Sequence, residues 1–378
     1  MSKLLNIFVI FTILLAPIMI CNLSNSDGGP DPSVNHPGTP DTYSPEKINI
    51  TGETFNNVGV ADPSIEYNNG TGYMAYSSVT VPNVNTHLAK STDSGKTWEF
   101  VKKLNVAEND TITVDRKGIH GTWQNEVPTL LYDPDDPGKE WKLFWHKYFS
   151  KEPHKKEDRL HSQGYIAYRY ASDPEGEWSD EEIVFGMGNY ANEGTNLSAL
   201  HPEMAEYKLF TEPGSLYKDG GIYLSLDAGL KTTDFGGVDK RKIILVRSKD
   251  HGRTWEYAGI LAEGKDVLQH GYLMATASSL AEEQNRQFLL FAPAASLLSF
   301  NKLHDGFYVV EFDDIAQGKL KEKDGKLVIH KRIAKILDAG GQADYDEENT
   351  CGGIIVLQEN HQSVQDYFSL YSTREKIV

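Results

Sequence analysis

The chain has 378 residues and a formal net charge of −17, and aromatic residues make up 11% of it. The negative charge disfavours nucleic acid or an anionic membrane surface as a partner, and it mildly disfavours polyanionic substrates. The 33 glycines and 16 prolines suit many short strands joined by turns, so we expect an all-β protein.

The N-terminus reads as a targeting segment. Lys3 precedes an apolar run over residues 4–20, which is typical of a signal peptide, and Cys21 follows directly. Residues 22–46 are rich in Ser, Asn, Gly, Pro and Asp, which predicts a flexible tether ahead of a domain at 47–378.

This order resembles a bacterial lipoprotein, which implies lipidation of Cys21 and a lipid anchor to the membrane. Ile20 departs from the pattern, because Gly, Ala or Ser usually stands before the Cys. Ordinary signal cleavage and an uncleaved anchor therefore stay open. In each case the sequence predicts an exported domain, either a cell-envelope lipoprotein (outer membrane or periplasm) or a secreted protein.

Two octapeptides, residues 91–98 and 248–255, share the pattern S-x-D-x-G-x-T-W. Each follows an apolar strand and combines a tight turn with a Trp at a fixed offset. A degenerate copy at 172–178 lies between them. The pattern resembles the Asp-box, or BNR repeat, of sialidases and related β-propellers, which implies a structural role at the blade periphery. The spacing of Asp93, Asp173 and Asp250 suits one four-stranded blade per copy.

The strands ahead of these copies follow the same period. Four blades begin near residues 63, 127, 214 and 273, and the strands at 352–358 and 366–372 begin a fifth. The segment 47–55 would supply the missing outer strand and close the ring. We therefore predict a single, monomeric five-bladed β-propeller with four-stranded antiparallel blades; a six-bladed sialidase-type ring is the alternative.

Three acidic residues stand where the first strands of blades begin, each followed by Pro at once or one residue later: Asp62, Glu126 and Glu212. A carboxylate ahead of Pro is a common turn motif, and for any one of them alone this is the simpler interpretation. Three at the starts of successive blades favour a functional site, because the entry loops of a propeller converge on one face.

The segments around these residues resemble five-bladed arabinanase and β-xylosidase glycosidases. The matching stretches are 60–65 with 72–78, then 123–128, then 211–224. The resemblance implies that Asp62 is the general base and Glu212 the general acid. It implies that Glu126, where the family usually has Asp, tunes the acid and orients the substrate.

A carboxylate base and a carboxylic acid are the two groups that glycoside hydrolysis with inversion requires, and they lie ~6.5–9.5 Å apart in such enzymes. A third carboxylate nearby would raise the acid's pKa by repulsion. Trp123 would stack on a sugar and His146 and His270 would contact it, whereas Trp145 is expected to fill the core. The histidines lack the close spacing of a zinc site, so we predict no metal or cofactor. A calcium-linked solvent network at His270 is the alternative.

The sequence therefore predicts an exported glycoside hydrolase acting on an oligo- or polysaccharide. An exo-sialidase is one alternative, but residues 60–63 lack the Arg expected on the first blade of that family, and Arg169, Arg247 and Arg253 lie in or near peripheral segments. A non-catalytic carbohydrate-binding or envelope-interaction propeller is the other alternative.

Overall fold

The computed structural model describes residues 50–53, 59–80, 83–151, 158–230, 241–296 and 306–333. These residues form an all-β unit with four large sheets, as predicted. Cys21 and Cys351, the tether and the predicted strands at 352–358 and 366–372 lie outside the described residues. Within the described residues, no helix is both long and apolar enough to span a membrane.

The strands of the first two sheets follow the predicted blades. Sheet one has the order β1-β5-β4-β3-β2. Its strands are β1 (Ile50–Thr51), β2 (Gly59–Asn68), β3 (Thr71–Thr80), β4 (Asn83–Ser91) and β5 (Trp98–Asn105). Sheet two has the order β10-β9-β8-β7-β6. Its strands are β6 (Glu108–Val114), β7 (Lys117–Tyr132), β8 (Trp141–Lys151), β9 (Arg159–Ala171) and β10 (Glu182–Gly186).

The other two sheets repeat this plan. Sheet three runs β11-β12-β13-β14, with β11 (Leu209–Lys218), β12 (Gly221–Gly229), β13 (Lys242–Ser248) and β14 (Glu256–Glu263). Sheet four contains β15 (Tyr272–Glu283), β16 (Arg286–Ser296), β17 (Phe307–Asp314), β18 (Lys319–Leu320) and β21 (Ile329–Ile333). A small hairpin pairs β19 (Glu322–Lys323) with β20 (Lys326–Leu327). Two short helices, α1 (Leu197–Leu200) and α2 (Gly264–Leu268), lie in the connections.

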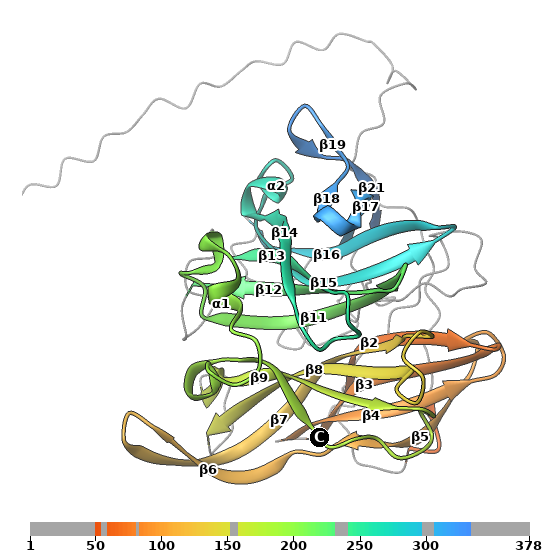
Figure 1. Ribbon diagram of the computed structural model, residues 1–378, viewed down its shortest axis with the longest axis vertical. Coiled ribbons are helices and arrows are strands. Elements are labelled where there is room, and N and C mark those ends of the chain that lie inside the picture. Colours follow the sequence, from red (N-terminus) through yellow and green to blue (C-terminus); the bar gives the residue numbers. More distant parts are fainter. Residues whose placement is uncertain are drawn as a thin grey trace, which may run out of the picture. The chain divides into compact units, whose positions relative to one another are not determined.

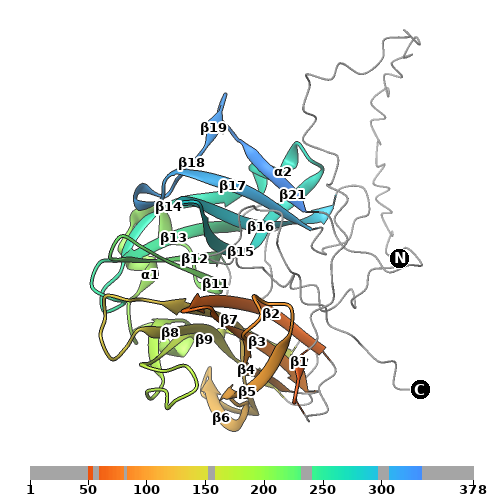
Figure 2. The same cartoon turned by 90° about the vertical axis from the view of Figure 1, so that its right-hand side faces the viewer.

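The sheets are arranged as in a propeller, with β2, β7, β11 and β15 as the innermost strands (Figures 1 and 2). β2 contacts β7, β7 contacts β11, and β11 contacts β15. The described residues thus supply four sheets of the ring; the fifth blade stays a prediction. The expected role of residues 47–55 differs in its described part, because Ile50 and Thr51 pair in parallel with β5 at the outer edge of sheet one.

The two octapeptides form the same turn. The Asp carboxylate accepts hydrogen bonds from the Thr backbone N–H and hydroxyl, at 2.9 and 2.6 Å for Asp93 and 2.8 and 2.6 Å for Asp250. The indole N–H of Trp98 or Trp255 donates to the Gly carbonyl of the turn. In each turn the Asp and Trp side chains therefore bond to groups of the same turn, and the Trp ring is buried.

The degenerate copy has a different role. Ala171 and Glu177 replace the Ser and Thr, and Asp173 accepts a bond from the backbone N–H of Glu175 at 3.0 Å. The Glu175 carboxylate in turn accepts bonds from the Tyr73 hydroxyl at 3.0 Å and the Lys90 ammonium at 2.9 Å. This turn thus connects sheet two to sheet one.

Asp250→Ala should reduce the free energy of unfolding by about 1–3 kcal/mol, because it leaves the Thr254 and Ser248 donors without their carboxylate acceptor. Urea unfolding followed by Trp fluorescence measures the change. Asp173→Ala, in the degenerate copy, is the matched control and should cost less. Equal losses in the two variants would contradict the structural role of the repeated turn.

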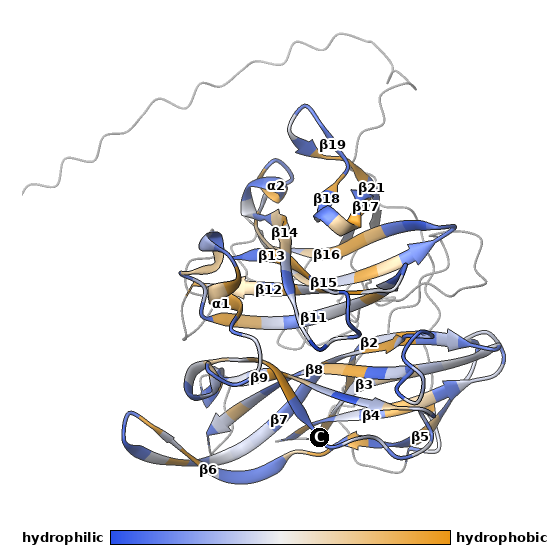
Figure 3. Ribbon diagram, viewed as in Figure 1, coloured by the Kyte–Doolittle hydropathy of each residue, from blue (hydrophilic) through white to orange (hydrophobic). Residues whose placement is uncertain are grey.

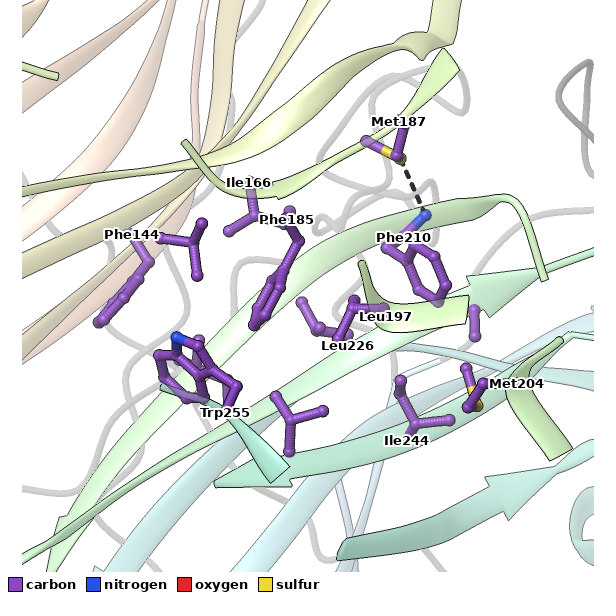
Figure 4. Packing of buried hydrophobic residues seen from close by; sticks show 14 of the residues in the cluster. Phe144, Ile166, Phe185, Met187, Leu197, Met204, Phe210, Leu226, Ile244 and Trp255 are labelled. Carbon is purple, nitrogen blue, oxygen red and sulfur yellow. Dashed lines mark hydrogen bonds between the residues drawn. The ribbon is translucent and has the colours of Figure 1, made fainter. Parts of the chain in front are cut away.

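The core lies between neighbouring sheets. Apolar residues concentrate in the strands, whereas the β19 hairpin is hydrophilic (Figure 3). One large cluster joins sheets two and three and includes Phe144, Ile166, Phe185, Phe210, Leu226, Ile244 and Trp255 (Figure 4). In it the backbone N–H of Phe210 approaches the Met187 sulfur at 3.1 Å. Trp145 is fully buried in another cluster, which agrees with its expected core role.

Candidate functional site

Each of the four innermost strands is interrupted by a bulge at the same place. The pairing register with the second strand shifts between Ala61 and Ser64, Glu126 and Thr129, Thr211 and Gly214, and Thr276 and Ser279. The first bulge residue has a left-handed backbone in every case: Asp62 (φ 51°), Val127 (52°), Glu212 (55°) and Ala277 (51°). Such conformations are strained for residues other than Gly, and they often occur at functional sites.

Proline explains why the bulge forms there. Pro63, Pro128 and Pro213 are the second bulge residues of sheets one to three, and Ser278 takes that place in sheet four. Proline has no backbone N–H, so within a sheet it is tolerated only at edges and bulges. The bulge then turns the preceding residue out of the regular strand alternation. Asp62 and Glu212 consequently occupy equivalent positions in sheets one and three.

Glu126 is not equivalent to these two residues. It stands one residue before the bulge and pairs with His146 on β8, while Val127 holds the position that corresponds to Asp62 and Glu212. The sequence had treated the three carboxylates as one repeated feature. The difference arises because Glu126 is separated from its Pro by one residue, and only the residue next to Pro enters the bulge.

Asp62 is 6% exposed, and the Ser77 hydroxyl and the Val127 backbone N–H both favour its ionised form. The Ser77 hydroxyl donates to its Oδ2 at 2.8 Å, and the backbone N–H of Val127 donates to Ser77 Oγ at 3.0 Å. Burial and the neighbouring Glu126 carboxylate raise the pKa of Asp62 to about 8, against the opposing effect of the Ser77 hydroxyl and the Val127 backbone.

Glu212 is partly exposed and is surrounded by other acids. Loss of hydration raises its pKa well above the ordinary value, and the charges of Asp227, Asp62 and Glu126 raise it further. The Arg241 guanidinium acts in the opposite direction. The carboxylates of Asp62, Glu126 and Glu212 therefore interact across sheets one, two and three. They lie at or beside bulges inside β2, β7 and β11, whereas the sequence places them where these strands begin.

Asp227 on β12 belongs to the same group and is 1% exposed. Its Oδ2 accepts hydrogen bonds from Arg241 at 3.3 Å, from the Ala277 backbone N–H at 3.3 Å and from the Thr276 hydroxyl. Burial raises the pKa of Asp227, and the Arg241 charge opposes this effect. This network joins sheet three to sheet four beside Glu212.

Two histidines lie beside Glu126. His146, opposite Glu126 on β8, is 1% exposed, and its ring stacks on that of His161 with centroids 5.4 Å apart. Tyr148 packs against both rings. Burial lowers the pKa of His146 to about 3, so its imidazole is neutral at physiological pH. His146 thus pairs across the strands with Glu126 and is in a form that donates or accepts one hydrogen bond per nitrogen.

Trp123 and His270 are placed differently from expectation. Trp123 is only 6% exposed, its indole N–H donates to Asp110 at 2.9 Å, and its ring packs against Phe149, Tyr165 and Tyr190. A ring covered in this way is part of the core and offers no stacking face. His270 follows α2, well ahead of the sheet-four bulge at Ala277, and packs edge-on against Tyr308.

A second cluster of titratable residues lies away from the bulges. Asp133, Asp136 and His251 have ligand-type atoms within 4.8 Å of one another, the one such group among the described residues. The buried Lys142 ammonium lies 2.7 Å from Asp136 and 3.4 Å from Asp133. The ammonium is shared by the two carboxylates, which also pair with His251 at 3.0 Å and Arg253 at 3.5 Å. The cluster joins sheet two to the octapeptide turn of sheet three.

Ser77, Asp227 and Arg241 are site residues that are not predicted from the sequence. Asp227 stands inside the apolar run 222–228, and a lone charge in a buried strand is a signal that a partner or a function is present. Ser77 and Arg241 carried no comparable signal. Arg169, Arg247 and Arg253 bind peripheral groups: the Leu104 carbonyl, Glu256 and the Asp250 carbonyl.

Solved structures similar to this chain include glycoside hydrolases. The GH32 β-fructofuranosidase of Bombyx mori matches at 14% identity and TM-score 0.44 over 71% of this chain and 49% of its own, so this chain spans about half its length. An exo-1,5-α-L-arabinanase from a bovine ruminal metagenomic library matches at 14% identity and TM-score 0.44, over 69% of this chain and 77% of its own.

The catalytic domain of the GH62 α-L-arabinofuranosidase of Coprinopsis cinerea matches at 12% identity and TM-score 0.44 over 85% of this chain and 81% of its own. No protein-family model matches the sequence, and no curated protein does. The likeness to the solved structures concerns the fold alone.

Proposed function

We propose that the protein is an exported glycoside hydrolase in which Asp62 is the general base and Glu212 the general acid. The observation that carries this proposal is the pair of acidic side chains on equivalent strained bulges of sheets one and three, both with raised pKa values. Strain and shifted pKa values at one place are characteristic of catalytic sites.

The surroundings of the two residues support different roles. Asp62 and Glu212 are acidic neighbours of each other, and both also face Glu126; Asp62 in addition has the Ser77 hydroxyl donor, whereas Glu212 has Asp227 as a further acidic neighbour. Asp62 is thus the more readily ionised group. It would take a proton from a water molecule as the water oxygen attacks the anomeric carbon. Glu212 would give its proton to the glycosidic oxygen as the bond from that oxygen to the anomeric carbon breaks.

The substrate class follows from the charges. Arg241 is the cation that acts on this group of acids, and it is paired with Asp227. The acids are Asp62, Glu126, Glu212 and Asp227. A uronic or sialic acid would place a further negative charge among them. The proposed substrate is therefore a neutral sugar residue at the end of, or within, an oligo- or polysaccharide, and the proposed stereochemical outcome is inversion.

The test is a panel of nitrophenyl glycosides of neutral pentoses and hexoses, with plant and algal oligosaccharides and a sialoside as comparison. We expect turnover on at least one neutral glycoside and none on the sialoside, with ¹H NMR reporting the anomer released first. Sialoside cleavage would favour the sialidase alternative. Absence of turnover on the whole panel, with saccharide binding retained in calorimetry, would favour a non-catalytic binding protein.

The value of kcat/KM should rise as the pH increases through about 8. Asp62 acts as a base only when ionised, and burial with the Glu126 charge raises its pKa to about 8, so activity is lost as pH falls below that range. Initial rates between pH 5 and 10 at low substrate concentration measure this limb. An ascending limb near pH 4, where an ordinary Asp ionises, would contradict the assignment of Asp62.

A further inference from the structure

Ser77 and Asp227 hold the same position in sheets one and three. Ser77 pairs with Ala61 and Asp227 pairs with Thr211, the residues immediately before the two bulges. Each also accepts the backbone N–H of the bulge residue in the following sheet: Val127 donates to Ser77 Oγ at 3.0 Å, and Ala277 donates to Asp227 Oδ2 at 3.3 Å. We call Ser77 and Asp227 the facing residues.

The two facing residues have opposite chemistry. The Ser77 hydroxyl donates a hydrogen bond to Asp62, and such a bond favours a carboxylate over a carboxylic acid. Asp227 brings a carboxylate to the same place beside Glu212. Its donors all bind Oδ2, and its Oδ1 has no hydrogen-bond partner in the part of the chain that the structure describes. The two bulges are thus alike in backbone and differ in what faces them.

We propose that the facing residue assigns the role of each carboxyl group: Ser77 makes Asp62 the proton acceptor, and Asp227 makes Glu212 the proton donor. This inference rests on the proposed function and deepens it. Both are positioning residues, because each acts through its neighbour in the site.

Glu126 does not separate the two roles. Its charge raises the pKa of Asp62 and that of Glu212 alike. Asp227 acts on Glu212 more strongly than Asp62 or Glu126 does, and Arg241 is the opposing cation. A carboxylate that acts on both Asp62 and Glu212 raises both pKa values, whereas Ser77 lowers the pKa of Asp62 and Asp227 raises that of Glu212. In this proposal Asp227 has the tuning role that the resemblance implies for Glu126.

A thermal-stability cycle tests the coupling without requiring turnover. Glu212→Gln is made in the wild-type, Asp227→Asn and Glu126→Gln backgrounds, and Tm is measured at pH 5 and pH 8. At pH 8 we expect Glu212→Gln to raise Tm, and we expect this gain to shrink more in the Asp227→Asn background than in the Glu126→Gln background. A gain that is unaffected by Asp227→Asn would overturn the inference.

The pH profile of kcat/KM is the second test. Asp227→Asn should move the alkaline limb, which reports Glu212, to lower pH by about one unit or more, with kcat retained near the new optimum. Ser77→Ala should move the acidic limb to higher pH. Ser78→Ala is the matched control, because this neighbouring hydroxyl binds Glu53 and should leave both limbs in place.

The outcomes separate this inference from the proposed function. If the wild-type protein hydrolyses a glycoside and neither limb moves in Asp227→Asn or Ser77→Ala, the inference fails alone. If the wild-type protein hydrolyses nothing, the proposed function fails, and the stability cycle still shows whether Asp227 controls the protonation of Glu212. If Asp227→Asn does not fold, Ser77→Ala still tests the inference. An acidic limb that stays at the wild-type pH in Ser77→Ala would overturn it.

Discussion

Glu212→Gln should abolish hydrolysis and at the same time make the folded protein more stable at pH 8. The amide cannot donate the proton that the leaving oxygen requires, so kcat/KM should fall about 100- to 10,000-fold. Binding of the saccharide, measured by calorimetry, should persist, because Gln has nearly the shape of Glu. Wild-type activity in this variant would contradict the catalytic assignment.

The gain in stability follows from the pKa of Glu212. Burial and three acidic neighbours raise it, so the folded protein keeps a proton that the unfolded chain releases above about pH 4.5. Raising the pH from there toward the folded-state pKa therefore favours unfolding, and Gln removes this effect. We expect Tm to rise by about 5 °C at pH 8 and to stay unchanged at pH 4.

Glu99→Gln, on the exposed face of β5, is the control for Glu212→Gln, and it should leave Tm within about 1–2 °C of wild type at both pH values. A Tm gain for Glu212→Gln that is equal at pH 4 and pH 8 would show that protonation is not its cause.

Lys142→Met should be the most destabilising of the single substitutions considered. The Lys142 side chain is fully buried between Asp133 and Asp136. Its removal takes the buried cation away from two acidic groups, which keep only the less buried His251 at 3.0 Å from Asp133 and Arg253 at 3.5 Å from Asp136. Breaking a buried ion pair in this way costs about 3–5 kcal/mol, which urea unfolding measures directly.

Two further variants check the reason for this loss. Lys90→Met removes the exposed ion pair with Glu175 and should cost at most about 1 kcal/mol. Adding Asp133→Asn and Asp136→Asn to Lys142→Met should recover part of the stability, because no uncompensated charge then remains. If the triple variant were less stable than Lys142→Met, packing rather than charge would explain the loss.

The sequence predicted the sheets well because their signals are local. Turns such as Asp93 to Trp98 recur at a fixed spacing, with apolar strands between them. Sheet three has the four predicted strands, whereas β1 and β6 extend sheets one and two to five strands and β21 pairs with β17 in sheet four. By contrast, the pairing of Ile50 and Thr51 with β5 depends on contacts between distant segments, for which two residues carry no signal.

The candidate site was predicted in part. The dipeptides Asp62-Pro63 and Glu212-Pro213 marked the two bulge carboxylates, because Pro inside a buried strand requires a bulge. Glu126 stands one residue before the bulge, where a one-residue change of register moves a side chain to another environment, and Trp123 is buried although a sugar-stacking role is expected from the sequence. Asp227 could not be assigned because its role depends on which residue it pairs with across the sheet.

The left-handed bulge occurs in all four described sheets; among the described residues, Asp62 and Glu212 are the acids at that position, and Val127 and Ala277 share the backbone without any reactive group. In these sheets the strained backbone therefore does not depend on the presence of an acid. In evolutionary terms, the bulges are equivalent positions at which a side chain can be substituted without a change in the surrounding backbone. Positions 127 and 277 are accordingly the places where a new reactive group would require the least backbone change.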